Sequence, residues 1–483
     1  MLDTRRKPKI GLLGIMHGLY DESQPQITTQ QEGFAKQVAA RLAGVADVIF
    51  PGAAKSRAAI EDRVRKFNTE GYDGIMIVML LYSPGFRLIK ALRDNRLPIL
   101  LANIQPIPSV TTDWDWSRLT TNQGIHGAQD TGNMLLHAGA RPAVITEDWQ
   151  SDAFPRFVED WARAAKTVTE LGRMHIACFS RMKGMGDIVG NDEAMLRVIG
   201  PEVFFEGIGE VYRRMEKVTD KEIDRQIAED GRSFAIDPKL PKENHRYAAR
   251  LQLGLEKFME DDGYNANFDV FREDGRFTQI PMLAASNLMA KGYAYSNEGD
   301  VHTAALVGAG HVIAGNGHFT EMYSLDFARD SALMSHMEEG NWRTARTDRP
   351  IRLIDRPLEI GGLSNPPTLV FSAQPGPATL VSLVPLDAGY RLVALEGEIL
   401  DSEEHHGIPM PYFHIKPDTG IRRSMDDWIL AGGTHHQALV LGRHARRWKM
   451  LCGMLGIGYT AVYHRRRFCA VCGSLLTSIA SAC

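Results

Sequence analysis

Apolar runs and helical segments alternate over the first third of the chain. Short apolar runs that suit buried strands lie at residues 9–15, 45–50, 74–79, 98–102 and 143–146. Between them, apolar positions recur at helical spacing over residues 29–42, 58–69 and 85–94. This alternation is typical of a doubly wound α/β domain with a parallel sheet. Ligands of such domains bind beyond the carboxyl ends of the strands, where residues 16–20 and 81–84 lie.

Two further regions follow the first. Residues 170–316 again mix strand and helix signals, and a long helix is expected over 243–261 because this segment is rich in strong helix formers. After Gly317 we expect a helix at 326–337 and then strands at 368–372, 378–384, 390–396 and 410–416. Gly, Pro and Asp turns separate these strands, which predicts a small antiparallel barrel or sandwich.

The predicted fold class is therefore α/β, with two doubly wound α/β domains followed by a strand-rich C-terminal domain that contains a small antiparallel barrel. The expected domains span residues 1–169, 170–316 and 317–462. Residues 463–483 differ, being basic and carrying Cys469 and Cys472. One such pair cannot fill the four positions of a structural zinc site. We expect a disordered tail there, or the product of a reading-frame slip.

Composition and charge narrow the class of protein. The 483 residues are 44% hydrophobic and 24% charged, which is ordinary for a globular protein. A net charge of −4 with both signs mixed gives no electrostatic reason to expect nucleic acid or an anionic membrane as a partner. No run approaches the roughly 18 apolar residues of a membrane helix, and the N-terminus does not resemble a signal peptide. Five cysteines, few and odd in number, fit a reduced compartment, so we expect a cytoplasmic protein.

Candidate metal ligands gather in the second half of the sequence. They are Glu298, Glu321, His336 and His436. Two carboxylates and two imidazoles suit Mn²⁺ or a similar ion, because carboxylates supply hard oxygen ligands and imidazole suits first-row transition metals. Taken singly, each residue has an ordinary interpretation as a solvated turn or a satisfied core side chain. Spacing alone does not separate these interpretations.

The order of several motifs resembles the L-arabinose isomerase family. The matching segments are residues 119–127, 263–268, 280–284, 288–293, 298–306, 319–321, 336–337 and 432–436, together with Gln105 and the helical segment 243–258. No single motif is decisive, but their joint order and spacing are specific. The resemblance extends over about residues 8 to 460.

This resemblance implies an active site with one divalent metal ion, Mn²⁺. The family's metal ligands fall on Glu298, Glu321, His336 and His436, and His435 is a neighbour that shapes the site. The implied reaction interconverts an open-chain aldose and ketose through an enediolate. Glu298 and Glu321 are the expected proton-transferring pair, since a carboxylate within reach can move a proton between two carbons.

The resemblance also implies residues that contact the sugar, and an oligomer. Gln123 and His126 match residues that reach a neighbouring subunit's active site, and Phe271 matches an aromatic residue that lines the sugar pocket. The expected assembly is a homohexamer.

Two positions depart from the family pattern. Met16 stands where the family has a sugar-binding Gln, and Leu81 stands where it has a polar residue. Because a pocket loses discrimination when it loses a hydrogen-bonding partner, L-arabinose is not assured as the preferred sugar. An isomerase for another sugar, such as a 6-deoxyhexose, and a non-catalytic sugar-binding protein remain alternatives. A nucleotide-dependent enzyme is disfavoured, since Gly308 and Gly310 are followed by Ile313 where a G-x-G-x-x-G motif needs glycine.

Overall fold

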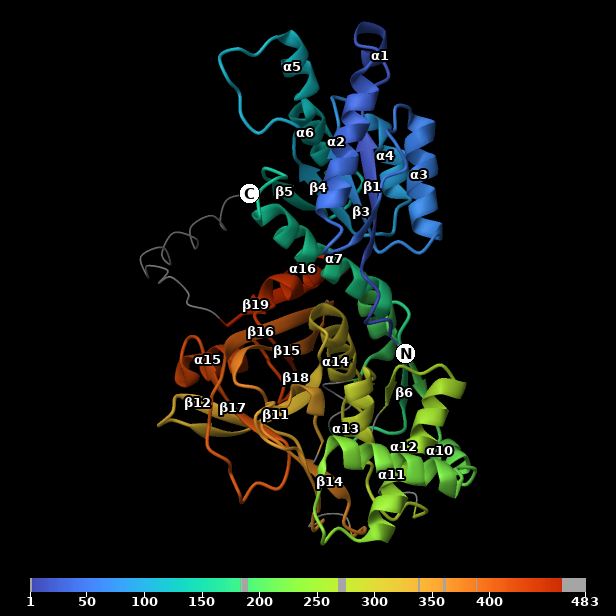
Figure 1. Ribbon diagram of the computed structural model, residues 1–483, viewed down its shortest axis with the longest axis vertical. Helices are drawn as coiled ribbons and strands as arrows, with labels where there is room; N and C mark the ends of the chain where they lie inside the picture. Colours follow the sequence, from blue (N-terminus) through green and yellow to red (C-terminus); the bar gives the residue numbers. More distant parts are fainter. Residues whose placement is uncertain are drawn as a thin grey trace, which may run out of the picture.

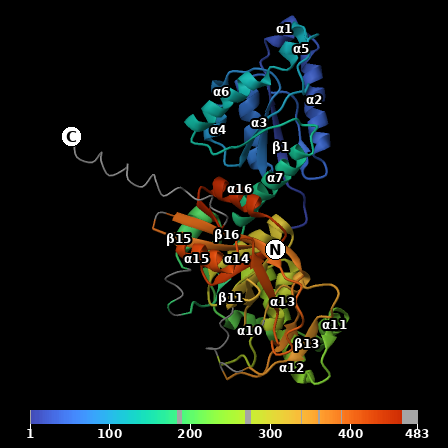
Figure 2. The same ribbon diagram turned by 90° about the vertical axis from the view of Figure 1, so that its left-hand side faces the viewer.

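An N-terminal α/β part and a larger second part make an elongated molecule, joined through the long helix α7 (Ala153–Leu171) (Figures 1 and 2). The computed structural model describes residues 2–182, 184, 190–267, 275–337, 339–358, 362–387 and 389–462. The predicted tail at 463–483 and the predicted pocket residue Phe271 lie outside these residues.

The apolar runs of the first third form a five-stranded parallel sheet in the order β2-β1-β3-β4-β5. Its strands are β1 (Lys9–Ile15), β2 (Asp47–Ile49), β3 (Gly74–Met79), β4 (Ile99–Asn103) and β5 (Ala143–Thr146). Its helices are α1 (Tyr20–Ser23), α2 (Ile27–Arg41), α3 (Arg57–Thr69), η1 (Gly85–Arg87), α4 (Ile89–Arg93), α5 (Trp116–Thr121) and α6 (Gly124–His137). Alternate strand residues face two separate buried clusters, one shared with α2 and α7 and the other with α3, α4 and α6. The predicted parallel sheet with helices on both faces is confirmed here.

A second parallel sheet follows α7, in the order β10-β9-β6-β7. Its strands are β6 (His175–Cys178), β7 (Glu202–Phe205), β9 (Ala266–Asn267) and β10 (Ala294–Tyr295). The helices of this part are α9 (Asp192–Ala194), η2 (Met195–Ile199), α10 (Gly209–Met215), α11 (Asp220–Ser233), α12 (Lys242–Asp261), α13 (Met282–Lys291) and α14 (Val301–Ala314). Helix α12 lies where the composition predicts a long helix.

The C-terminal strands form a closed antiparallel barrel. Around the barrel the strands are β15 (Gly376–Leu386), β18 (His436–Leu441), β11 (His318–Asp326), β12 (Ser331–Ser335), β17 (Tyr412–Pro417) and β16 (Gly389–Ile399). Pairing of β15 with β16 closes the ring. The predicted small antiparallel barrel is confirmed.

The predicted helix over residues 326–337 is wrong. The segment contains β12, which pairs with β11 on one side and β17 on the other. Ala332 and Met334 alternate toward the buried barrel core. Helix-forming residues such as Ala, Leu and Met favoured the helix locally, but pairing with two neighbouring strands and burial in the barrel overrode that weak preference.

The remaining described elements are short strands and helices outside the six barrel strands. They are β8 (Ala235–Ile236), η3 (Trp342–Thr344), β13 (Arg352–Asp355), β14 (Pro367–Val370), α15 (Ile421–Leu430), α16 (Ala445–Leu455) and β19 (Gly458–Ala461). Strands β14, β13 and β8 form a small separate sheet. None of the described helices has the length and apolar character needed to span a membrane.

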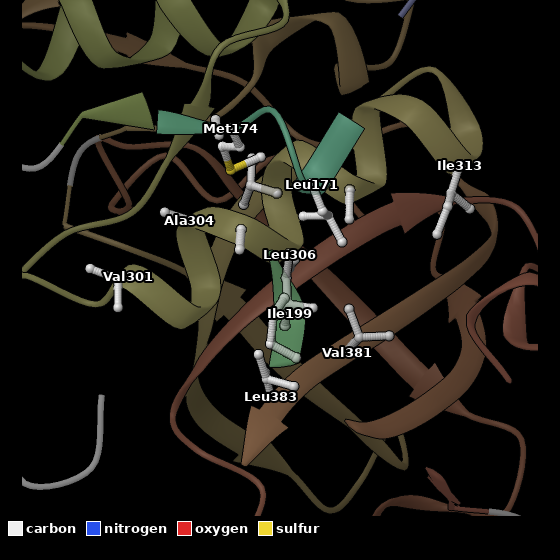
Figure 3. Close-up of a cluster of buried hydrophobic side chains, with 14 of the residues drawn as sticks. Leu171, Met174, Ile199, Val301, Ala304, Leu306, Ile313, Val381 and Leu383 are labelled. Carbon is white, nitrogen blue, oxygen red and sulfur yellow. The ribbon is translucent and has the colours of Figure 1, made fainter. Parts of the chain in front are cut away.

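Helix α14 is packed into a core that unites the central sheet with the barrel. Figure 3 shows Leu306 of α14 close to Leu171 of α7, Ile199 of η2 and Leu383 of β15. Val301 begins this helix and belongs to the same cluster. Because the start of α14 is held by this core, the turn just before it is held against the barrel as well.

Candidate metal centre

Three barrel strands bring two imidazoles to one carboxylate. In β11, Glu321 pairs with Ser335 of β12 on one side and with His436 of β18 on the other. His336 follows Ser335 directly, so it lies beside the same end of β11. One potential ligand atom from each of Glu321, His336 and His436 lies within 4.8 Å of the other two. The antiparallel register therefore assembles this group from residues that are far apart in the sequence.

Glu298 approaches the same place from the turn between β10 and α14. Its backbone has φ +61°, a left-handed conformation that is strained for a residue other than glycine. The next residue, Gly299, also has a positive φ of +80°, and a Cβ there would come within 2.5 Å of the Ser180 carbonyl oxygen. The Met182 amide donates to the Glu298 carbonyl at 3.0 Å. This turn holds Glu298 Oε2 at 3.6 Å from His436 Nε2.

The four predicted ligands lie in two overlapping groups. Glu321 is grouped with His336 and His436, and Glu298 is grouped with His435 and His436, each within 4.8 Å. Among the described residues, no single group at this separation contains all four. His435 is about half exposed, and its Nε2 lies 4.0 Å from Glu321 Oε2. We call these five residues the barrel centre.

Two buried carboxylates behind the histidines were not assigned from the sequence. Glu339, which is 0% exposed, lies with Oε1 2.7 Å from His336 Nδ1. Asp300, which is 1% exposed, lies with Oδ2 3.1 Å from His436 Nδ1. Each follows a predicted ligand by two or three positions, which is the only signal that the sequence offered. A carboxylate that binds Nδ1 of an imidazole leaves Nε2 free to face a ligand.

The barrel centre fits a divalent cation. His436 Nε2 is buried and has no hydrogen-bond partner among the described residues, although buried polar atoms are nearly always paired. Carboxylate oxygens and imidazole nitrogens surround it, and both are common ligands of Mn²⁺ and neighbouring transition metals. A cation at this place would give the orphaned nitrogen a partner.

Electrostatics of the barrel centre depend on pairing between acids and imidazoles. Burial raises the pKa of the Glu321 carboxyl, although His336 and His436 oppose this rise. Burial lowers the pKa of His336, but the carboxylates of Glu339, Glu321 and Glu298 together outweigh burial, so the pKa lies above the ordinary value. Burial raises the pKa of Asp300, but the hydrogen bond and charge of His436, together with His302 and Thr303, outweigh it, so the pKa lies below the ordinary value. A bound cation would replace imidazole protons as the counter-charge, since metal-bound histidines are neutral.

Met16 and Leu81 lie inside the N-terminal core. Both side chains are 0% exposed and belong to the cluster under α2 and α7. The Thr28 hydroxyl lies 3.9 Å from the Met16 sulfur. The polar group at this end of β1 is His17, whose Nε2 lies 2.6 Å from Arg87 Nη2. The sequence reasoning missed His17, which stands directly beside the substituted position.

Gln123 and His126 lie at the start of α6, in the N-terminal part. Gln123 is half-buried and His126 is exposed, with its ring 6.5 Å from that of Tyr82. In both views, α6 lies on the other side of α7 from strand β11 (Figures 1 and 2). Within one chain these two residues are therefore apart from the barrel centre. We call His17, Gln123 and His126 the N-terminal rim.

Comparison with protein-family models gives three matches in series. An L-arabinose isomerase N-terminal domain matches residues 12–173, a central domain matches 185–316 and a C-terminal domain matches 316–458. The L-arabinose isomerase of Clostridium beijerinckii is 30% identical over 379 residues, which cover 76% of each chain. That of Bacillus subtilis is 28% identical over 458 residues, covering 91% of this chain and 90% of the relative. That of Geobacillus stearothermophilus is 31% identical over 408 residues, covering 80% and 81%.

Solved structures give only a weak likeness. A periplasmic solute-binding protein from Actinobacillus succinogenes with bound D-allose is 12% identical, covers 62% of this chain and 88% of its own, and has a TM-score of 0.17. A solute-binding protein from Agrobacterium vitis with bound α-D-tagatopyranose is 14% identical, covers 64% and 87%, and has a TM-score of 0.16. At such scores the likeness carries no argument.

Proposed function

This chain belongs to the L-arabinose isomerase family, and from that premise we propose that it is a divalent-metal-dependent aldose–ketose isomerase. The observation that carries the proposal is the barrel centre, where two carboxylates meet two carboxylate-backed imidazoles, and where the buried Nε2 of His436 has no hydrogen-bond partner in the part of the chain that the structure describes. A protein that only binds sugar has no need of this arrangement. We also propose that the chain has three domains, spanning residues 1–169, 170–316 and 317–462.

Glu298, Glu321, His336 and His436 are the residues that would hold the ion. The supporting geometry is the pair of overlapping groups that share His436. His435, which is half exposed at the same place, would border the substrate rather than the core. When bound, Mn²⁺ would polarise the sugar carbonyl and stabilise negative charge on its oxygen.

The chain's own carboxylates would move the proton. In the forward direction, one of Glu298 and Glu321 takes the proton from C2 of an open-chain aldose, and the electron pair forms a C1–C2 double bond as the C1 carbonyl oxygen gains negative charge. The proton of the C2 hydroxyl is transferred to the C1 oxygen, and the carboxylic acid returns its proton to C1. The product is a ketose with its carbonyl at C2. Burial of Glu321 supports this role, because a desolvated carboxylate is a better proton acceptor.

We further propose that a second copy of the chain completes the active site through its N-terminal rim. Helix α6, which begins beside Gln123 and carries His126, lies on the other side of α7 from barrel strand β11 (Figures 1 and 2). Shortly before these two residues in the sequence, the chain carries exposed apolar side chains, including Trp116 at 77%, Val110 at 73% and Leu119 at 51%. Exposed apolar patches of this kind mark protein–protein contacts. A homohexamer is the assembly that the family resemblance predicts.

The sugar would be an open-chain aldose, with L-arabinose and 6-deoxyhexoses as the two classes to compare. The buried position of Met16 leaves the polar contact at this end of β1 to His17. That placement supports a rim whose recognition of the sugar differs from one based on a glutamine amide.

An activity assay tests the proposed function. The purified protein is stripped with EDTA, supplied with Mn²⁺ and offered a panel of pentoses and 6-deoxyhexoses, and ketose formation is measured. We expect turnover of at least one aldose that depends on the added metal. Saturable sugar binding without any ketose product would instead support a non-catalytic sugar-binding protein.

A further inference from the structure

Glu339 is a fully buried carboxylate outside the proposed ligand set. It follows β12 closely and is 0% exposed. Its Oε1 lies 2.7 Å from His336 Nδ1, 3.1 Å from the Tyr295 hydroxyl and 3.4 Å from Asn297 Nδ2. Burying a carboxylate is unfavourable unless several donors surround it, and these three hydrogen bonds help to stabilise the charge in the interior.

The same carboxylate is connected to a second proposed ligand. Asn297 donates to Glu339 through Nδ2, while its Oδ1 accepts the backbone N–H of Glu298 at 2.7 Å. That peptide is the one whose φ of +61° needs support from its surroundings. Glu339 therefore touches His336 directly and supports Glu298 through one intervening amide.

Asp300 differs from Glu339, because it both binds a histidine and caps a helix. It binds Nδ1 of His436, but its Oδ1 also caps α14 by accepting the Thr303 backbone N–H at 2.9 Å. Its Oδ2 accepts the Thr303 hydroxyl at 2.6 Å. A substitution of Asp300 would disturb the helix as well as the histidine. Glu339 lies outside every described helix, so its effect on the barrel centre is easier to isolate.

We propose that Glu339 is a positioning residue that aims both His336 and Glu298 at one cation, and so joins the barrel to the β10–α14 turn. This inference rests on the proposed function. With Nδ1 occupied by Glu339, the His336 ring presents Nε2 to the barrel centre. Without Glu339, the ring can rotate and the Asn297 amide loses the acceptor that orders it. The barrel centre would then lose its cation affinity while the barrel itself stays folded.

Two variants separate charge from geometry. Glu339→Gln keeps the size and one acceptor oxygen for His336 but removes the charge, whereas Glu339→Met removes both. The readout is the dissociation constant of Mn²⁺, measured on the full-length apo protein by loss of the free Mn²⁺ electron paramagnetic resonance signal. We expect Glu339→Met to weaken Mn²⁺ binding by about 10- to 100-fold, the usual effect of removing a carboxylate behind a ligand, and Glu339→Gln to weaken it less.

A matched control comes from another buried carboxylate. Glu170, on α7, is 4% exposed and binds Arg6 at 2.8 Å, away from the barrel centre. Glu170→Gln should lower the thermal midpoint of the apo protein but leave Mn²⁺ affinity unchanged. If Glu339→Met does not fold, the Glu339→Gln variant still decides the question, since it preserves the volume of the side chain.

A double-substitution cycle tests the connection to Glu298. Asn297→Ala should weaken Mn²⁺ binding in the wild-type background, but should add little in the Glu339→Gln background, because coupled residues are not additive. Unchanged Mn²⁺ affinity in both Glu339 variants would overturn the inference. Fully additive losses from the Asn297 and Glu339 substitutions would overturn the part of it that connects Glu339 to Glu298. A wild-type protein that binds no Mn²⁺ and converts no sugar would instead overturn the proposed function.

Discussion

The barrel centre and the N-terminal rim both gather polar side chains, but they lie in different parts of the chain. All the proposed ligands belong to the barrel centre, whereas helix α6, which carries His126 of the rim, lies on the other side of α7 from strand β11 (Figures 1 and 2). At the barrel centre, each histidine of the proposed ligand set is backed by a carboxylate that is at most 1% exposed. At the rim, His126 is exposed and Gln123 is half-buried. Under the proposed function, cation binding would be a property of the single subunit, whereas sugar recognition would need the assembly.

Removing a carboxylate from the barrel centre should give the largest effect. We expect Glu321→Gln to lower kcat by about 10³-fold, because a positioned acid–base group contributes roughly 10²- to 10⁴-fold. Circular dichroism should show an unchanged fold. The matched control is Glu398→Gln, a half-exposed carboxylate on barrel strand β16 that pairs with Arg443, and it should stay within about twofold of the wild type. Equal loss in both variants would contradict the assignment.

The second-largest effect should be the change in thermal stability when metal is removed, which should depend on the barrel centre and not on the rim. A cation that binds only the folded state stabilises it by about 2.7 kcal/mol when its concentration is 100 times the dissociation constant. We therefore expect EDTA to lower the thermal midpoint and Mn²⁺ to restore it. His126→Ala, at the rim, should keep the full Mn²⁺-dependent shift. A thermal midpoint that changes with neither EDTA nor Mn²⁺ would contradict the assignment of the barrel centre as a metal site.

Acid should destabilise the half of the molecule that contains the barrel. Burial lowers the pKa of His311, on α14, to about 4, and its Nδ1 accepts the Gly317 backbone N–H at 3.1 Å. The unfolded chain thus takes up this proton first as the pH falls. Stability is full above about pH 6.5 and is lost toward pH 4, with about 2 kcal/mol gone near pH 5. His311→Gln should flatten the dependence of the thermal midpoint on pH, measured in EDTA, and an equally steep profile in the variant would show that another group is responsible.

The smallest of these effects should come from the rim. We expect His126→Ala to lower kcat/KM by roughly tenfold, the value of one hydrogen bond to substrate of about 1.4 kcal/mol, with unchanged Mn²⁺ affinity. His137→Ala is the control, since it removes an exposed histidine from the other end of the same helix. A monomer with full activity, measured by light scattering together with the assay, would contradict a rim that serves the neighbouring subunit.

Strands with continuous apolar runs were predictable from the sequence. Those at β1, β3 and β5 begin and end where the apolar runs do. Residues 326–337 were not predictable in this way, because their composition favours a helix while their burial depends on β11 and β17. Local preference decides a segment only when no distant strand competes for its hydrogen bonds.

The sequence by itself determined which side chains can hold a cation, since residue type sets ligand chemistry, and it determined the alternating order of strands and helices. Tertiary structure alone decided how those side chains meet. The pairing of Glu321 with Ser335 and His436 follows from barrel register, and register is a property of paired strands. The role we infer for Glu339 likewise arises only in space, because its contacts reach back to Tyr295 and Asn297 across the barrel boundary. A sequence specifies such contacts only through the fold that brings them within hydrogen-bonding distance.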